Sequence, residues 1–156
     1  MEQSLLPALE QFIVAAKRVT YVGAGKKLLP YRLGSKDLQY TEGDWTYHDS
    51  YFGDADFVGQ EVVYRKGQPV WAMNYFGRIL EPSLISAAEA GAMIQRSLTA
   101  MYGENRFLGG FAYTHEELCY TDESAGNAAW FTGREQIERQ GVRVYELVYH
   151  GGLIKG

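Results

Sequence analysis

A β-hairpin at residues 61–75 is the feature that most constrains the fold of this chain. Two segments rich in Val, Tyr and Trp flank the turn Lys66-Gly67, a pattern typical of a tight hairpin. If Arg65 pairs with Gln68, the alternation of side chains along each strand divides the hairpin into two faces. This pairing predicts Val62, Tyr64, Trp71, Met73 and Tyr75 on one face, and Glu61, Val63, Val70, Ala72 and Asn74 on the other.

Other segments have a recognisable period. Residues 4–18 and 82–101 carry apolar residues at three- and four-residue spacing, which predicts two amphipathic helices. Residues 36–52 contain an alternating strand, and residues 142–150 form a last strand after the turn Gln140-Gly141. Between these elements we expect an extended segment at 107–120, a polar turn at 122–127, a short strand at 129–131 and a turn of helix within 133–139.

Two helices and five to six strands, mostly joined by hairpins, indicate an α+β fold. We expect a single domain over residues 1–156, in which an antiparallel curved β-sheet packs on one face against the two helices. A chain of this length buries a core without disulfides or metals. The sequence shows no internal repeat at a fixed period and no linker.

Composition argues against several classes of function. The net charge is −4, from 15 basic and 19 acidic residues, so we expect no direct binding to nucleic acid and no membrane attachment. The one cysteine, Cys119, excludes an internal disulfide framework, and we interpret it as a packing residue. No segment has the apolar length of a membrane span or the pattern of a signal peptide, so we expect a cytoplasmic protein.

Motifs for cofactors and metals are weak. Residues 22–27, VGAGKK, resemble a phosphate-binding loop, but the spacing of glycines and the missing Ser or Thr after the lysine favour a flexible turn. The three histidines match no metal-ligand spacing. We therefore expect neither a cofactor nor a bound metal.

The aromatic residues carry the functional hypothesis. The chain has 12 Tyr, 7 Phe and 3 Trp, and a buried tyrosine hydroxyl needs a hydrogen-bond partner. So many phenols on neighbouring strands favour a solvent-reachable pocket between sheet and helices over a dry core. The predicted ligand-binding residues are Tyr51, Trp71, Asn74, Tyr75, Tyr149 and His150, with Asn74 and His150 as polar anchors.

Two alternatives remain open. An acid–base or hydrolytic enzyme would use a carboxylate, Asp49 or Glu61, with His48 or His150. A homodimer or other interaction module would use an exposed strand or an aromatic patch. The acidic residues near the aromatic strands, taken singly, are each interpreted as exposed or salt-bridged; they are Asp37, Glu42, Asp49, Glu61, Glu135 and Glu146.

Several strings resemble a bacterial domain family of unknown function that is often found C-terminal to a helix-turn-helix of the Xre/Cro repressor type. The strings are GSKDLQY at 34–40, DSYFG at 49–53, PVWAMNYFGR at 69–78, and VYE at 144–146 followed by HGG at 150–152. The resemblance implies a domain that senses a ligand or mediates dimerisation, and it supplies no catalytic residues. Only eleven residues precede Phe12, so we expect a stand-alone form without the DNA-binding helices.

Overall fold

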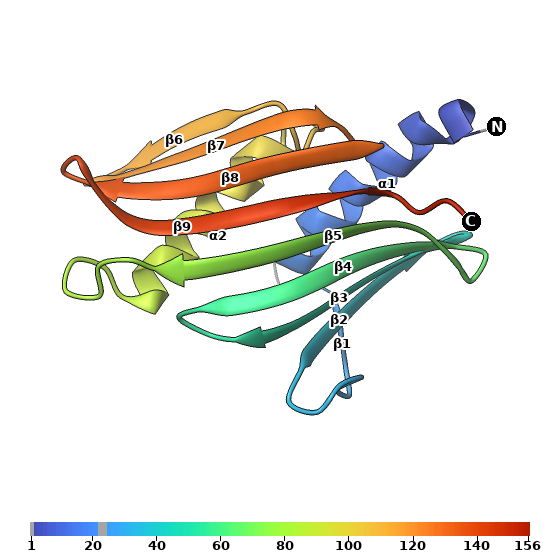
Figure 1. The fold of residues 1–156 in the computed structure, drawn as a ribbon, viewed down its shortest axis with the longest axis horizontal. Helices are drawn as coiled ribbons and strands as arrows, with labels where there is room; N and C mark the ends of the chain where they lie inside the picture. The colour runs from blue at the N-terminus through green and yellow to red at the C-terminus, as the bar shows by residue number, and fades with distance from the viewer. Residues whose placement is uncertain (1, 22–24) are drawn as a thin grey trace.

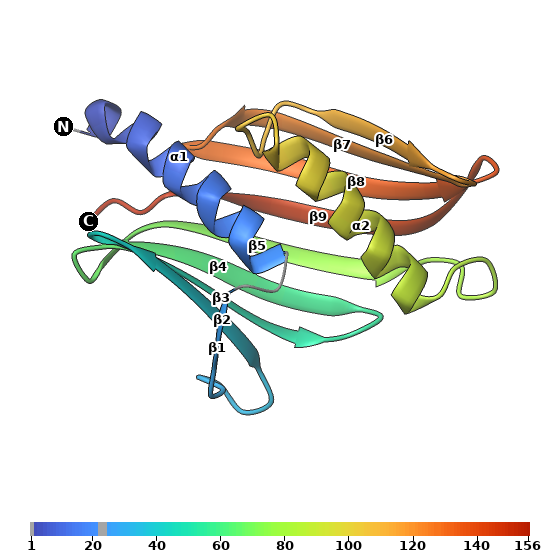
Figure 2. The same ribbon diagram turned by 180° about the vertical axis from the view of Figure 1, so that it is seen from behind.

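The structure is a computed structural model that describes residues 2–21 and 25–156. The first half of the phosphate-loop-like stretch, residues 22–24, lies outside the described residues. In the described part of the chain, nine antiparallel strands form one sheet in the order β1-β2-β3-β4-β5-β9-β8-β7-β6, and both helices lie on the same face of it (Figures 1 and 2). We call the face covered by the helices the inner face and the opposite one the outer face.

Along the chain, a helix followed by a set of strands occurs twice. The first set is α1 (Glu2–Tyr21), β1 (Lys26–Leu28), β2 (Lys36–Glu42), β3 (Trp45–Gly53), β4 (Phe57–Arg65) and β5 (Gln68–Ile79). The second set is α2 (Ala87–Tyr102), β6 (Phe111–His115), β7 (Leu118–Asn127), β8 (Trp130–Arg139) and β9 (Val142–Leu153). Strands β5 and β9 pair at the centre and join the two sets into one sheet (Figure 1).

The predicted class, α+β with two helices, agrees with the structure, but the prediction of five to six strands was wrong. The expected polar turn at 122–127 is the second half of β7, and the expected helical turn within 133–139 belongs to β8. These strands are polar because their outer side chains meet solvent while several inner side chains are carboxylates. A composition rule that assigns polar runs to loops therefore missed them.

The predicted faces of the first hairpin were also wrong, because a β-bulge shifts the pairing. Arg65 pairs with Gln68 as expected, but the register shifts between Val63 and Tyr64, and Val63 then faces Trp71. One extra residue moves every later side chain to the other face. Glu61 consequently lies on the inner face.

The two sets of elements repeat one another, contrary to the expectation of no internal repeat. The pattern Phe-x-Gly-x-Glu occurs at 57–61 in β4 and at 131–135 in β8, and Tyr-x-Asp occurs at 47–49 in β3 and at 120–122 in β7. The bulge recurs at the equivalent place in β8, between Ile137 and Glu138. Tyr75 of β5 pairs with its own equivalent, Tyr149 of β9, so an approximate twofold axis passes through this pair.

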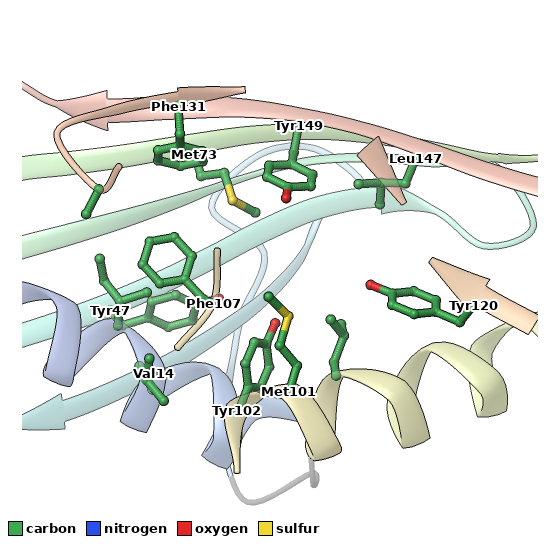
Figure 3. Close-up of a cluster of buried hydrophobic side chains, with 14 of the residues drawn as sticks. Val14, Tyr47, Met73, Met101, Tyr102, Phe107, Tyr120, Phe131, Leu147 and Tyr149 are labelled. Carbon is green, nitrogen blue, oxygen red and sulfur yellow. The ribbon is translucent and has the colours of Figure 1, made fainter. Parts of the chain in front are cut away.

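The core fills the space between the sheet and the helices. Phe131 and Tyr149 point from the inner face toward Met101 and Tyr102 of α2 (Figure 3). Helix α2 is fixed at its start by a capping box, in which Ser86 and Glu89 each accept a hydrogen bond from the other's backbone amide. The candidate site lies between the inner face and the helices.

Candidate functional site

A cavity of about 370 Å³ lies between the inner face and the helices. Its volume falls in the range of sites for small organic ligands. The sheet contributes aromatic rings and carboxyl groups, and α2 contributes Gly91, Ile94 and Gln95. The other residues that line it are Thr20, Lys36, Leu38, Asp49, Tyr51, Gly53, Asp54, Phe57, Tyr75, Glu135, Tyr145 and Leu147.

Two tyrosines lie flat on the inner face because glycines on the neighbouring strands leave them room. A Cβ built on Gly59 would stand 2.3 Å from the Tyr75 hydroxyl, and one built on Gly133 would stand 2.0 Å from Cζ of Tyr149. Each ring thus covers a glycine, and its hydroxyl points along the sheet. Tyr75 donates to Asp49 and Tyr149 donates to Asp122, both at 2.7 Å.

A buried ion pair lies at the centre of this arrangement. Nζ of Lys17, from α1, lies 2.8 and 3.0 Å from the two carboxylate oxygens of Glu61, and both residues are about 2% exposed. The Tyr47 hydroxyl donates a further hydrogen bond to Glu61. The sequence places Lys17 in the last turn of a helix, where a cation also complements the helix dipole, so its burial was not predicted.

Three other inner carboxyl groups lack this compensation and hold their protons to unusually high pH. Burial and the charge of Glu61 raise the pKa of Asp49 to about 7. Burial raises the pKa of Asp122 to about 6, although the Tyr149 hydrogen bond opposes the rise. Burial and the charge of Asp122 raise the pKa of Glu135 to about 8.

A second, smaller cavity of about 30 Å³ lies beside the first and shares Tyr75, Glu135 and Leu147 with it. Lys17, Asp122 and the other members of its wall are core residues. Glu135 therefore faces both cavities, with Asp122 and Lys17 around the smaller one.

Among the described residues, the buried hydroxyls of Tyr120 and Tyr145 have no hydrogen-bond partner of normal geometry. Tyr145 is fully buried, stacks on Phe57 with ring centroids 6.5 Å apart, and lines the larger cavity. The Tyr120 hydroxyl lies close enough to Glu135 to lower the pKa of Glu135 against the effect of burial. An unsatisfied buried hydroxyl costs free energy unless a further molecule completes its bonding.

The residues predicted from the sequence divide into three groups. Tyr51 and Tyr75 line the larger cavity, and Tyr149 lines the smaller one. Trp71 is fully buried in the core, where it stacks on Phe131 and donates to a backbone carbonyl. Asn74 and His150 pair with each other across β5 and β9 on the outer face, away from both cavities, so the structure does not assemble them with the tyrosines.

The carboxylate–histidine pair considered for an enzyme is not assembled either. His48 and His150 lie on the outer face, whereas Asp49 and Glu61 lie on the inner face. Nε2 of His48 instead lies 2.6 Å from Asp37. Burial favours the neutral form of Asp37, but hydrogen bonds from Ser35, His48 and a backbone amide outweigh it and lower its pKa to about 2.

Sequence reasoning missed Lys17 and Asp122, and judged Glu135 to be exposed or salt-bridged. One signal was present: Glu61 and Glu135 occupy the same place in the repeated Phe-x-Gly-x-Glu pattern. Within residues 2–21 and 25–156, no three or more His, Cys, Asp or Glu side chains gather as a metal site would require. Neither described helix is long and apolar enough to span a membrane.

Comparison with known proteins gives the family and no function. Neither a search of curated proteins nor a search of solved structures found a match. A family model described as "Domain of unknown function (DUF5680)" matches residues 49–154, from β3 to the end of β9. Because the match covers more than half of the chain, including both copies of the Phe-x-Gly-x-Glu pattern, the protein belongs to this family of domains of unknown function.

Proposed function

We propose that this protein is a small-molecule-binding domain whose ligand occupies the larger cavity. The observation that carries the proposal is the cavity wall itself, in which Tyr51, Tyr75 and Tyr145 lie beside the carboxyl groups of Asp49 and Glu135. An apolar space with a few convergent polar groups is typical of a ligand site. The unsatisfied hydroxyl of Tyr145 supports the same interpretation.

A purely structural role explains these groups poorly. Leucine or phenylalanine at positions 135 and 145 would fill the space without the cost of a buried carboxyl or an unpaired hydroxyl. Residues that lower stability in the free protein are common at binding and catalytic sites. The resemblance to domains attached to Xre/Cro-type regulators supports a sensory role for such a ligand.

The test is native mass spectrometry of freshly purified protein, compared with a variant whose cavity is filled. Gly91 of α2 lines the cavity, and a Cβ added there meets nothing within 4 Å. We expect Gly91→Phe to fill the cavity without disturbing the backbone, and Gly91→Ala, the matched control, to leave it open. A co-purifying small molecule on the native protein and on Gly91→Ala, but absent from Gly91→Phe, is the expected result.

Two outcomes would contradict the proposal. One is equal retention of the bound molecule by all three proteins, because the ligand would then lie elsewhere. The other is no bound molecule on any of them together with no thermal stabilisation of the native protein by a small-molecule library. Circular dichroism and the melting temperature show whether Gly91→Phe is folded.

General acid–base catalysis in the same cavity is the second candidate. It is favoured by two carboxyl groups, Asp49 and Glu135, with pKa values of about 7 and 8 in a cleft, where a side chain holds and releases a proton near neutral pH. If the co-purifying molecule is chemically converted by the native protein and not by Glu135→Gln, the enzyme interpretation replaces simple binding.

Homodimer formation stays a prediction. Light scattering coupled to size exclusion measures the mass in solution directly, and a monomer at high concentration would contradict it.

A further inference from the structure

The two halves of the sheet carry the same acidic framework. Glu61 in β4 and Glu135 in β8 occupy equivalent places, each two residues after a glycine that a tyrosine ring covers. A tyrosine of the preceding strand approaches each carboxyl group, Tyr47 in the first half and Tyr120 in the second. The fold therefore builds the same carboxyl pocket twice.

Among the described residues, only the first of these two glutamates forms an ion pair. Glu61 is neutralised by Lys17 of α1 at 2.8 Å. Helix α2 has a single basic residue, Arg96, and it is exposed. Of the residues that the structure describes, none forms an ion pair with Glu135. No lysine of α2 therefore contacts Glu135 as Lys17 of α1 contacts Glu61.

Nearby cations do not compensate for this. Arg106 is held by Glu104 and by the backbone carbonyls of Leu108 and Gly110. Lys36, at the rim of the larger cavity, donates to the carbonyl of Gly53. Lys17 acts on Glu135 only at longer range, since it already pairs with Glu61.

The interior contains more carboxyl groups than cations, which also favours a cationic ligand. Four carboxyl groups, those of Asp49, Glu61, Asp122 and Glu135, face the ring-lined interior, and Lys17 is the one cation in direct contact with any of them among the described residues. Carboxylates removed from water need a positive partner or must stay protonated. A cationic ligand supplies such a partner, and a neutral or anionic ligand does not.

We propose that the ligand of the larger cavity carries a protonated amine, and that its ammonium group pairs with Glu135 as Lys17 pairs with Glu61. This inference rests on the proposed function. The apolar remainder of the ligand would lie against Phe57, Ile94 and Leu147, and the free hydroxyl of Tyr145 would bond to a polar atom of it.

Binding of the ammonium should release a proton. Without ligand, Glu135 holds its proton at neutral pH because of burial and the nearby charge of Asp122. The other titratable groups that face it are Tyr120, Tyr145 and Tyr149, together with Glu61 and Lys17. When the cation arrives, the carboxylate form becomes favoured, and the proton leaves for the solvent.

Isothermal titration calorimetry on protein freed of bound molecules tests the inference with probes that differ only in charge. The cations are 2-phenylethylamine and n-hexylamine, and the neutral counterparts are 2-phenylethanol and n-hexanol. We expect at least one amine to bind about 10- to 100-fold more tightly than its alcohol at pH 7, the effect of a hydrogen bond to a charged group. Titrations in phosphate and in Tris measure the proton released.

The variants separate this inference from the proposed function. Glu135→Gln should remove the preference for the amine and the proton release but leave alcohol binding unchanged, whereas Glu138→Gln on the same strand should change neither. Alcohols that bind as tightly as the amines, with binding lost in Gly91→Phe, overturn the cationic ligand and leave the cavity as a binding site. No binding of any probe overturns the cationic ligand, and native mass spectrometry then decides the proposed function separately.

Discussion

Replacement of Glu135 by glutamine should change the way in which stability depends on pH. The pKa of this carboxyl group rises from 4.5 in the unfolded chain to about 8 in the folded protein. Between these values the folded state holds a proton that the unfolded state has lost. The free energy of unfolding must therefore fall as the pH rises through this window, and the loss is complete above about pH 8.

The size of the effect follows from the width of the window. One proton held by the folded state alone changes the free energy of unfolding by about 1.4 kcal/mol for each pH unit. The full window would give about 4–5 kcal/mol, but Asp122 shares the interior with Glu135 and water reaches the larger cavity. We therefore expect about 2–4 kcal/mol, which is a large part of the stability of a domain of this size.

Urea unfolding followed by tryptophan fluorescence measures this effect at pH 5, 6.5 and 8.5. At pH 5, near the lower end of the window, the free energies of unfolding of the native protein and Glu135→Gln should differ by less than about 1 kcal/mol, because glutamine has the shape of the protonated side chain. At pH 8.5 the variant should be the more stable one. Some pH dependence should remain in the variant because Asp49 and Asp122 also have raised pKa values.

Glu138→Gln is the control, since Glu138 lies on the same strand but outside both cavities. It should leave the pH dependence of the native protein unchanged. If Glu135→Gln shows the same loss of stability between pH 5 and 8.5 as the native protein, the carboxyl group of Glu135 titrates normally, and it does not hold a proton at neutral pH in the folded state.

Three further changes test other parts of the structure. Lys17→Met leaves Glu61 buried without a cation and should lower the free energy of unfolding by about 3–5 kcal/mol at pH 7. The double variant with Glu61→Gln should recover most of this loss. A Lys17→Met protein as stable as the native one would contradict the buried ion pair. Gly133→Ala places a Cβ 2.0 Å from the ring of Tyr149, so the ring must move, and urea unfolding should show a loss of about 2–4 kcal/mol. The pKa of Asp37 is lowered to about 2, so its hydrogen bonds should stabilise the native protein fully above about pH 4 and progressively less as the pH falls toward 2. In acid unfolding over this range, Asp37→Asn should lose less stability than the native protein, because the contribution of Asp37 is removed while other carboxyl groups, such as Glu89 with its lowered pKa, still titrate.

The parts of the fold that depend on local sequence could be predicted. The turns Lys66-Gly67 and Gln140-Gly141 do join hairpins, because all four residues have the positive φ that such turns require and glycine adopts it freely. Both helices are present near the predicted positions, since their apolar spacing reports the face that packs on the sheet. Each of these signals lies within a few neighbouring residues.

The parts that depend on long-range pairing could not be predicted. The bulge at Val63 and Tyr64 is a property of two strands together, and no single residue in either strand indicates it. It decides whether Glu61 faces solvent or the helices, so the candidate site changes with it. The ion pair from Lys17 to Glu61 joins a helix to a strand 44 positions away, a distance over which spacing in the sequence carries no information.

The repeat provides an internal comparison that separates the needs of the fold from those of a site. Both halves bend in the same way, cover a glycine with a tyrosine and bury a glutamate at the same place, so these features are explained by the architecture. The first half closes its carboxyl pocket with Lys17, which demonstrates that a lysine from the covering helix is compatible with this sheet. The second half has the same sheet geometry at Glu135 but, within the described residues, leaves Glu135 without an ion pair and facing a cavity of about 370 Å³. If stability alone mattered, a lysine would pair with the buried glutamate in both halves. The lack of an ion pair at Glu135 among the described residues therefore indicates a requirement other than folding, such as the binding of a ligand.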